Sequence, residues 1–219
     1  MNSFITIPTP ILKNIASGHK NIPTMYYHSF KPIQKLFWAR LAAITQMLKG
    51  LSGNVLDFGG GGGIYLPTLA QVFQKVICLD LVVDEAQSIK EMYSLKNVDI
   101  IQSDALKIKL PDNYFDVIIA ADVLEHFQEL TPPIRTIYEW LRLGGRLFIS
   151  GPSENWLYRF GRKFFGIHKP PDHYHSVIEI EHELSKYFRI RRKMFLPWYS
   201  DISVVESFAV FTIIEAEKI

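Results

Sequence analysis

The sequence of 219 residues predicts an α/β fold: a doubly wound, mostly parallel sheet of seven strands, with one antiparallel strand near the C-terminus. Short apolar runs alternate with helical patterns between residues 54 and 150, which is typical of βαβ units. Residues 114–121 are apolar almost throughout, as expected for a strand that is covered on both faces. Beyond residue 187, two strand-like runs follow each other with no helix between them, which indicates a hairpin.

The elements are predicted from periodicity and from residues that end helices. Apolar residues at spacings of three and four predict a helix over 31–49, after a proline-punctuated, irregular stretch over 1–30. Strands are predicted over the apolar runs 54–58, 75–81, 97–102, 114–121 and 146–150. Helices are predicted over 64–73, from Asp84 onward with that residue as N-cap, and over 132–143, where Gly144 and Gly145 stop the helix. A helix over 177–187 precedes the last two strands, 188–196 and 203–215.

We divide the sequence into an N-terminal helical cap, residues 1–50, and a main domain, residues 51–219. Prolines and glycines among aromatic and basic residues interrupt the βα pattern at about 151–175, which predicts a lid-like insertion. The formal charge of +2 neither requires nor excludes an anionic partner. Cys78 is the only cysteine, and no apolar run approaches the roughly 20 residues of a membrane span. Because the N-terminus also lacks a basic n-region, we expect a cytoplasmic protein.

A glycine-rich turn follows the first predicted strand. Residues 54–63 read N-V-L-D-F-G-G-G-G-G, so Asp57 precedes the alternate glycines Gly59, Gly61 and Gly63. Glycines let a ligand approach the backbone and permit positive φ angles. A dinucleotide site needs G-x-G-x-x-G, and neither register of this run supplies the third glycine. A carboxylate would also repel a pyrophosphate and attract an ammonium group, so the turn favours a nucleoside that carries an amino acid over NAD.

This turn resembles the first motif of the class I S-adenosylmethionine-dependent methyltransferases. The resemblance continues in order along the chain, in segments that read ICLDL, VDIIQSDALKIKLPDNYFDVIIAADVLEHF and LRLGGRLFIS. It covers about residues 50–151, and as a set these motifs are specific. It implies a Rossmann-like methyltransferase domain over 51–219 and an enzyme that uses S-adenosyl-L-methionine and releases S-adenosyl-L-homocysteine.

The resemblance also implies roles for single residues. Asp80, at the end of the second predicted strand, matches the family's acidic residue that holds the ribose hydroxyls, and a carboxylate can accept both bonds. Asp104 matches the residue that meets the adenine amino group, and Leu81 could pack on the adenine face. The predicted cofactor-binding residues are Asp57, Gly59, Gly61, Gly63, Asp80, Leu81, Asp104, Ala105 and Ala121.

The residues after the fourth predicted strand resemble the small-molecule group of the family, which includes quinone-ring C-methyltransferases and O-methyltransferases. Amino-directed DNA methyltransferases carry a D/N/S-P-P-aromatic motif there, whereas this chain reads A-D-V-L, so we expect no DNA substrate. His126 in D-V-L-E-H lies at the carboxyl edge of the predicted sheet, where open α/β folds bind ligands. It is the first candidate for a general base, and its alternative role is to fasten a helix.

The segment HKPPDHYH supplies further candidates. His173 and His175 could act as a base or bind substrate, or only hydrogen-bond the loop. With His168 and Asp172 they would form an acceptable metal ligand set. We nevertheless expect no metal, because a proline-led loop has no regular geometry and transferases of this kind seldom need one. The predicted catalytic residues are therefore His126, His173 and His175.

The insertion contains the segment NWLYRFGRKFFGIHK, which mixes basic and aromatic side chains. Such a segment can cover the cofactor as a lid, bind a lipid- or glycan-like anion, bind RNA, or contact an anionic membrane surface. The predicted function is transfer of a methyl group to an O, C or N atom of a small or lipid/glycan-like acceptor. The alternatives are an RNA methyltransferase and a regulatory protein that binds S-adenosylmethionine without turnover. The sequence predicts no particular oligomeric state.

Overall fold

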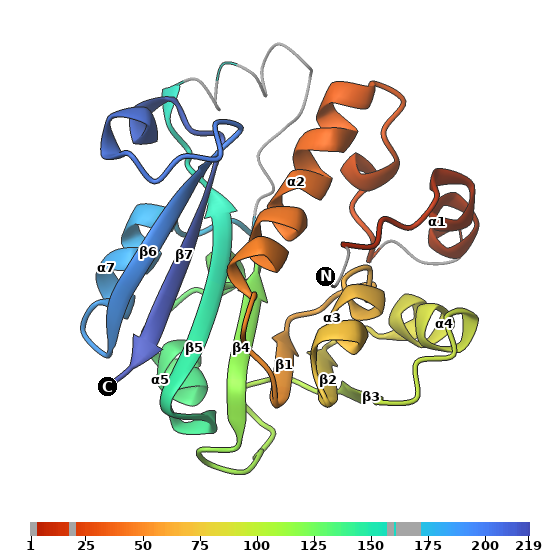
Figure 1. The fold of residues 1–219 in the computed structure, drawn as a ribbon, viewed down its shortest axis with the longest axis horizontal. Helices are drawn as coiled ribbons and strands as arrows, with labels where there is room; N and C mark the ends of the chain where they lie inside the picture. Colours follow the sequence, from red (N-terminus) through yellow and green to blue (C-terminus); the bar gives the residue numbers. More distant parts are fainter. Residues whose placement is uncertain (1–3, 18–20, 157–159, 161–171) are drawn as a thin grey trace.

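The computed structural model describes residues 4–17, 21–156, 160 and 172–219, and Figure 1 shows how its elements are arranged. In chain order these are α1 (Thr9–Ala16), η1 (Thr24–Tyr27), α2 (Lys31–Met47), β1 (Asn54–Phe58), α3 (Leu66–Val72), β2 (Lys75–Asp80), α4 (Asp84–Met92), β3 (Val98–Gln102), β4 (Phe115–Ala121), η2 (Leu124–His126), α5 (Thr131–Trp140), β5 (Leu141–Pro152), α7 (Val177–Leu184), β6 (Phe188–Leu196), η3 (Ser203–Phe208) and β7 (Phe211–Lys218).

One sheet of seven strands organises the described part of the chain, in the order β3-β2-β1-β4-β5-β7-β6. Strands β1 to β5 pair in parallel, and β7 runs antiparallel to both of its neighbours, β5 and β6. The predicted fold class is confirmed, including the single antiparallel strand. The strand order reverses between β1 and β4, and in open α/β sheets this switch point opens a crevice at the carboxyl ends of the strands.

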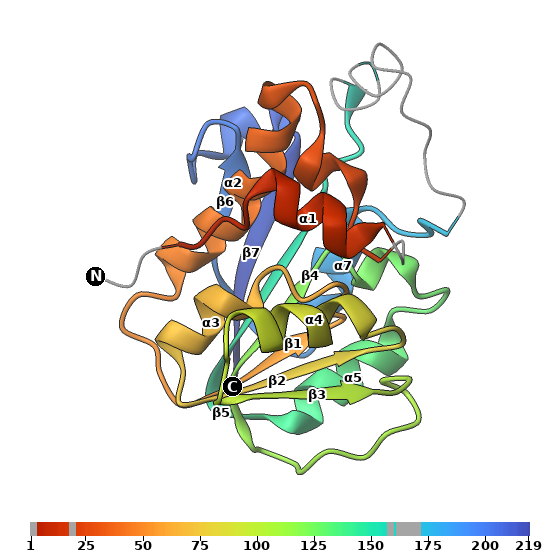
Figure 2. The same ribbon diagram turned by 90° about the vertical axis from the view of Figure 1, so that its right-hand side faces the viewer.

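Two apolar cores cover the two faces of the sheet. Val55 of β1 packs in one core with residues of α2, α3 and α4, and its neighbour Leu56 packs in the other core with residues of α5 and α7. Figure 2 shows α3 and α4 above strands β1 to β3 and α5 below them. Because successive side chains of a strand point to opposite faces, a run that is apolar throughout fills both cores. This explains why β1, β2 and β4 are apolar along nearly their whole length.

The N-terminal stretch is more regular than the sequence suggested. We predicted residues 1–30 to be irregular, and this was wrong, because α1 and η1 lie there. Pro10 falls in the first turn of α1, where a proline costs no hydrogen bond. Leu12 is fully buried, and Gln34 of α2 donates to Thr9 Oγ1 and to the carbonyl of Tyr26. Tertiary packing therefore holds a helix of eight residues that is too short to be stable alone.

Several predicted boundaries were also wrong. Helix α5 ends at Trp140, before the two glycines, because Leu141 already pairs with Phe115 of β4. Val83, not Asp84, is the N-cap of α4, and no side chain caps that helix. The last strand begins at Phe211, because η3 occupies residues 203–208. Within the described residues, no helix is both long and apolar enough to cross a bilayer.

Candidate functional site

A cavity of about 680 Å³ opens at the carboxyl ends of β1, β2 and β4, at the switch point of the sheet. Its volume lies in the range of ligand-binding pockets. The glycine-rich turn forms its floor, with the loops that follow β2, β3 and β4 around it. The segment from Asn21 to Tyr26 closes one side. Every predicted cofactor-binding residue except Gly63 lines this cavity.

Most glycines of the turn are packed too closely to accept a side chain. A Cβ atom at Gly60 would lie 2.7 Å from both Asp57 Oδ2 and Cys78 Sγ. Gly59 and Gly61 have φ angles of +68° and +53°, which favour glycine. Gly63 serves a different purpose, because a Cβ there would lie 2.7 Å from Cα and Cβ of Ala86 in α4. The turn therefore offers a ligand a cradle of backbone atoms without side chains. Its last glycine, Gly63, lets α4 pack closely against the turn.

Asp57 is a buried carboxylate at the end of β1. The residue is 4% exposed, and within the described chain its Oδ2 atom has no hydrogen-bond partner. Burial raises the pKa of Asp57 to about 7, and the nearby carboxylate of Asp80 adds to the rise. Burial also raises the pKa of the Cys78 thiol, with Asp57 and Asp80 contributing. An unsatisfied buried carboxylate beside a cavity suits a ligand that brings its own cation.

Asp80 lies at the mouth of the same cradle. Its Oδ2 accepts a hydrogen bond from the Gly61 amide at 2.7 Å, and its Oδ1 accepts one from the Val82 amide at 3.1 Å. Leu81 is 64% exposed and lines the cavity next to it. Asp104, after β3, accepts a bond from the Leu106 amide, which lowers its pKa. The three carboxylates of Asp57, Asp80 and Asp104 therefore line one cavity.

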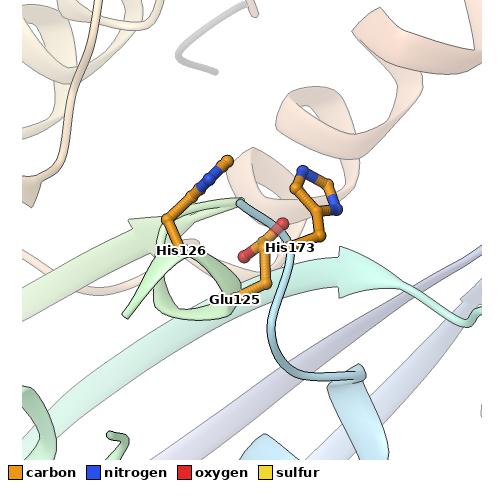
Figure 3. Close-up of side chains that lie close together, drawn as sticks. All are labelled: Glu125, His126 and His173. Carbon is orange, nitrogen blue, oxygen red and sulfur yellow. The ribbon is translucent and has the colours of Figure 1, made fainter. Parts of the chain in front are cut away.

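A cluster of polar side chains borders the cavity where η2 meets the loop before α7. His126 lines the cavity, and its Nδ1 lies 2.8 Å from Asp172 Oδ2. The ring of His173 packs edge-on against that of His126, with 4.7 Å between the centroids. Figure 3 shows the Glu125 carboxylate beside these two rings. Burial tends to raise the pKa of Asp172, but a hydrogen bond with its own backbone and the nearby His126 outweigh this and lower it. His175 turns away, with Nε2 3.1 Å from the Gln128 carbonyl. Neither His173 nor His175 lines the cavity.

Comparison with known proteins agrees with this geometry. A family model described as "Methyltransferase domain" matches residues 56–149, which span the glycine turn, Asp80, Asp104 and His126. Over this part the chain is similar to the class I S-adenosylmethionine-dependent methyltransferases. The resemblance seen in the sequence is thereby confirmed.

The chain is similar to curated relatives and to solved structures. The "Ubiquinone biosynthesis O-methyltransferase" of Pseudomonas entomophila is 30% identical over 132 residues, which are 58% of this chain and 56% of that protein. A SAM-dependent methyltransferase structure from Aquifex aeolicus is 21% identical, covers 97% of this chain and 100% of its own, and has a TM-score of 0.66. The N-methyltransferase NodS of Bradyrhizobium japonicum, in complex with S-adenosyl-L-homocysteine, is 12% identical, covers 96% and 98%, and has a TM-score of 0.65. The chain spans about half the length of the curated relatives it matches.

Sequence reasoning missed an ion pair with a buried arginine. Arg40 of α2 is 3% exposed and pairs with Asp122, which follows β4 with a φ of +54°. The guanidinium lies over the rings of Phe37 and Phe211, with 4.8 and 4.5 Å to the centroids, and donates to the Tyr26 hydroxyl at 2.7 Å. Both charged residues line the cavity. A charge on the apolar face of the predicted helix 31–49 was the available signal.

Most of the predicted lid lies outside the described residues. This applies to the basic residues Arg159, Arg162, Lys163 and Lys169, to the aromatic residues Tyr158, Phe164 and Phe165, and to His168. Within the described part, Trp156 and Phe160 are more than 60% exposed, and Trp156 packs edge-on against Phe208.

Proposed function

We propose that this protein binds S-adenosylmethionine in the cavity and transfers its methyl group to an oxygen atom of a small or lipid-like acceptor. One observation carries the proposal: a buried, unpartnered Asp57 oxygen in a glycine cradle, with a second carboxylate, Asp80, at the mouth. S-adenosylmethionine offers an ammonium group and a ribose diol, which match these two carboxylates. The neighbouring N-methyltransferase in complex with S-adenosylhomocysteine has the same fold, which supports the choice of cofactor.

The protein's own contribution is to hold the reactants and exclude water. Asp57 would bind the ammonium group, Asp80 the ribose hydroxyls and Asp104 the adenine amino group. When bound, the cofactor supplies a methyl group on a sulfonium, and the acceptor displaces the sulfur from that methyl group in line. The segment from Asn21 to Tyr26 covers one side of the cavity and keeps water from the reacting atoms.

We place the acceptor's reacting oxygen at the His126 end of the cavity. The contact with Asp172 engages Nδ1 of His126 and leaves Nε2 for a ligand. Its lone pair can take the acceptor's proton directly, or it can bind a cation that lowers the acceptor's pKa. The curated O-methyltransferase relatives support an oxygen acceptor. A cytoplasmic location is part of the proposal, because the only cysteine, Cys78, is a buried free thiol.

Calorimetry with S-adenosylmethionine, S-adenosylhomocysteine and NAD tests the cofactor. We expect micromolar binding of the first two and none of NAD. Binding of NAD alone would overturn the proposal.

Transfer of labelled methyl groups into a fractionated cell extract tests the activity. Label in a small-molecule or lipid fraction is the expected result. Label in RNA, with steeply salt-dependent RNA binding, would favour an RNA methyltransferase instead. Tight cofactor binding with no label in any fraction would favour a regulatory protein.

A further inference from the structure

Glu125, His126 and His173 form a compact set of metal-ligating side chains beside the cavity. One possible ligand atom from each residue lies within 4.8 Å of those of the other two. Glu125 and His126 come from η2, and His173 comes from the loop before α7 (Figure 3). We propose that these three side chains bind a divalent cation of the zinc class, with a fourth position open toward the cavity.

The buried carboxylate of Glu125 is the strongest evidence. The residue is 1% exposed, and neither of its side-chain oxygens accepts a hydrogen bond from another residue of the described chain. Taking a carboxylate out of water is expensive unless a cation or several donors compensate it. Figure 3 shows this carboxylate beside the two imidazole rings, and a cation held by all three side chains would compensate it.

The chemistry of the set fits a borderline cation. Two imidazoles and one carboxylate are the protein ligands of many catalytic zinc sites, which keep a fourth position for water or substrate. Zinc ligands lie about 2.0–2.2 Å from the ion, so ligand atoms around it lie roughly 3.5 Å apart. A separation of 4.8 Å would have to close by about 1.3 Å. Small side-chain rotations accommodate a change of that size.

Asp172 supplies the support that a metal-binding histidine usually has. Its carboxylate contacts Nδ1 of His126 at 2.8 Å, which fixes the ring and directs Nε2 toward a metal. Sequence reasoning assigned Asp172 to the ligand set and expected no metal, because it considered the loop alone. The structure instead brings η2 against that loop, and Asp172 holds one of the ligands.

The role of the ion rests on the proposed function. His126 lines the cavity, so an ion on its Nε2 can contact an acceptor hydroxyl there. The ion would lower the pKa of that hydroxyl. The proton leaves to water, and the oxygen's electron pair forms the new O–C bond as the methyl–sulfur bond breaks. The acceptor class is then an alcohol or phenol whose oxygen can bind a metal.

Zinc titration of the full chain, after treatment with a chelator and dialysis, tests the site. We expect one zinc ion per chain, and we expect Glu125→Gln and His173→Ala to weaken zinc binding at least 100-fold. Asp172→Asn should weaken it about tenfold, as for other residues that support a ligand. His182→Ala, which removes an exposed histidine of α7, is the matched control and should bind zinc like the wild type.

The same preparations are titrated with S-adenosylmethionine to separate the two proposals. Retained S-adenosylmethionine binding shows that Glu125→Gln and His173→Ala are folded. If the wild type binds no zinc saturably, or if Glu125→Gln binds it as well as His182→Ala does, the metal site is wrong. If the wild type binds zinc but not S-adenosylmethionine, the metal-site proposal stands and the proposed function is wrong.

Discussion

Replacing Asp57 by asparagine should change how stability depends on pH. The pKa of Asp57 is about 7 in the folded protein and 3.8 as its ordinary value, and burial is the main cause. Between those two pH values the unfolded chain loses this proton while the folded chain keeps it. Stability therefore falls as pH rises through this window and levels off above about pH 7.

The size of the effect follows from the same two values. A pKa shift of about three units lowers the free energy of unfolding at pH 8 by about 4 kcal/mol. About 3 kcal/mol of this loss occurs between pH 5 and pH 8. Asparagine does not titrate, so Asp57→Asn should lack this loss. Urea unfolding of the ligand-free protein at pH 5 and pH 8 measures it, and all other groups cancel in the comparison of variant with wild type.

Asp201→Asn, at an exposed position, is the control and should follow the wild type at both pH values. Equal differences between Asp57→Asn and wild type at pH 5 and pH 8 would refute the reasoning. The ligand gives a second check. S-adenosylmethionine needs the ionised carboxylate, so its affinity for the wild type should rise up to tenfold per pH unit below about pH 7 and then level off.

Three further substitutions test other parts of the site. Asp80→Ala should weaken S-adenosylmethionine binding at least 100-fold, or about 2.7 kcal/mol, in calorimetry of a folded variant; unchanged affinity would exclude the ribose contact. Gly60→Ala places a Cβ against buried atoms and should cost about 1–3 kcal/mol in urea unfolding, whereas Gly151→Ala, with 3.4 Å to its nearest neighbour, should cost little. Arg40→Ala removes a buried side chain and leaves the half-buried Asp122 without its cation, so it should cost about 2–5 kcal/mol. A loss below 1 kcal/mol would contradict the importance of the pair.

The sequence predicts those features that depend on neighbouring residues. The strand at 54–58, the glycine turn and the strand at 188–196 were placed correctly, because apolar runs and turn residues are local signals. The end of α5 could not be predicted in this way. Leu141 leaves the helix because it pairs with Phe115, which lies 26 residues earlier. Pairing across the chain decides that boundary, and the glycines do not.

The same limit applies to the site. Asp57 and Asp80 follow strands, so their place at one edge of the sheet could be predicted. Arg40 and Asp122 lie far apart in the chain, and no local pattern pairs them. Glu125 is similar, because its burial against His173 depends on how the loop before α7 packs on η2. Sequence reasoning therefore found the cofactor side of the cavity and missed most of the opposite side.

The segment that closes the cavity makes ligand binding and the docking of the N-terminal segment interdependent. Asn21 donates from its backbone to Glu85 at 2.8 Å and from its side chain to the Val82 carbonyl at 2.7 Å, and Ile22 rests on Gly62. A ligand in the cavity touches this segment, so ligand binding and docking must strengthen each other by the same factor. A protease that cuts near Asn21 should therefore cut more slowly as the ligand saturates the protein, and the rate becomes a measure of occupancy.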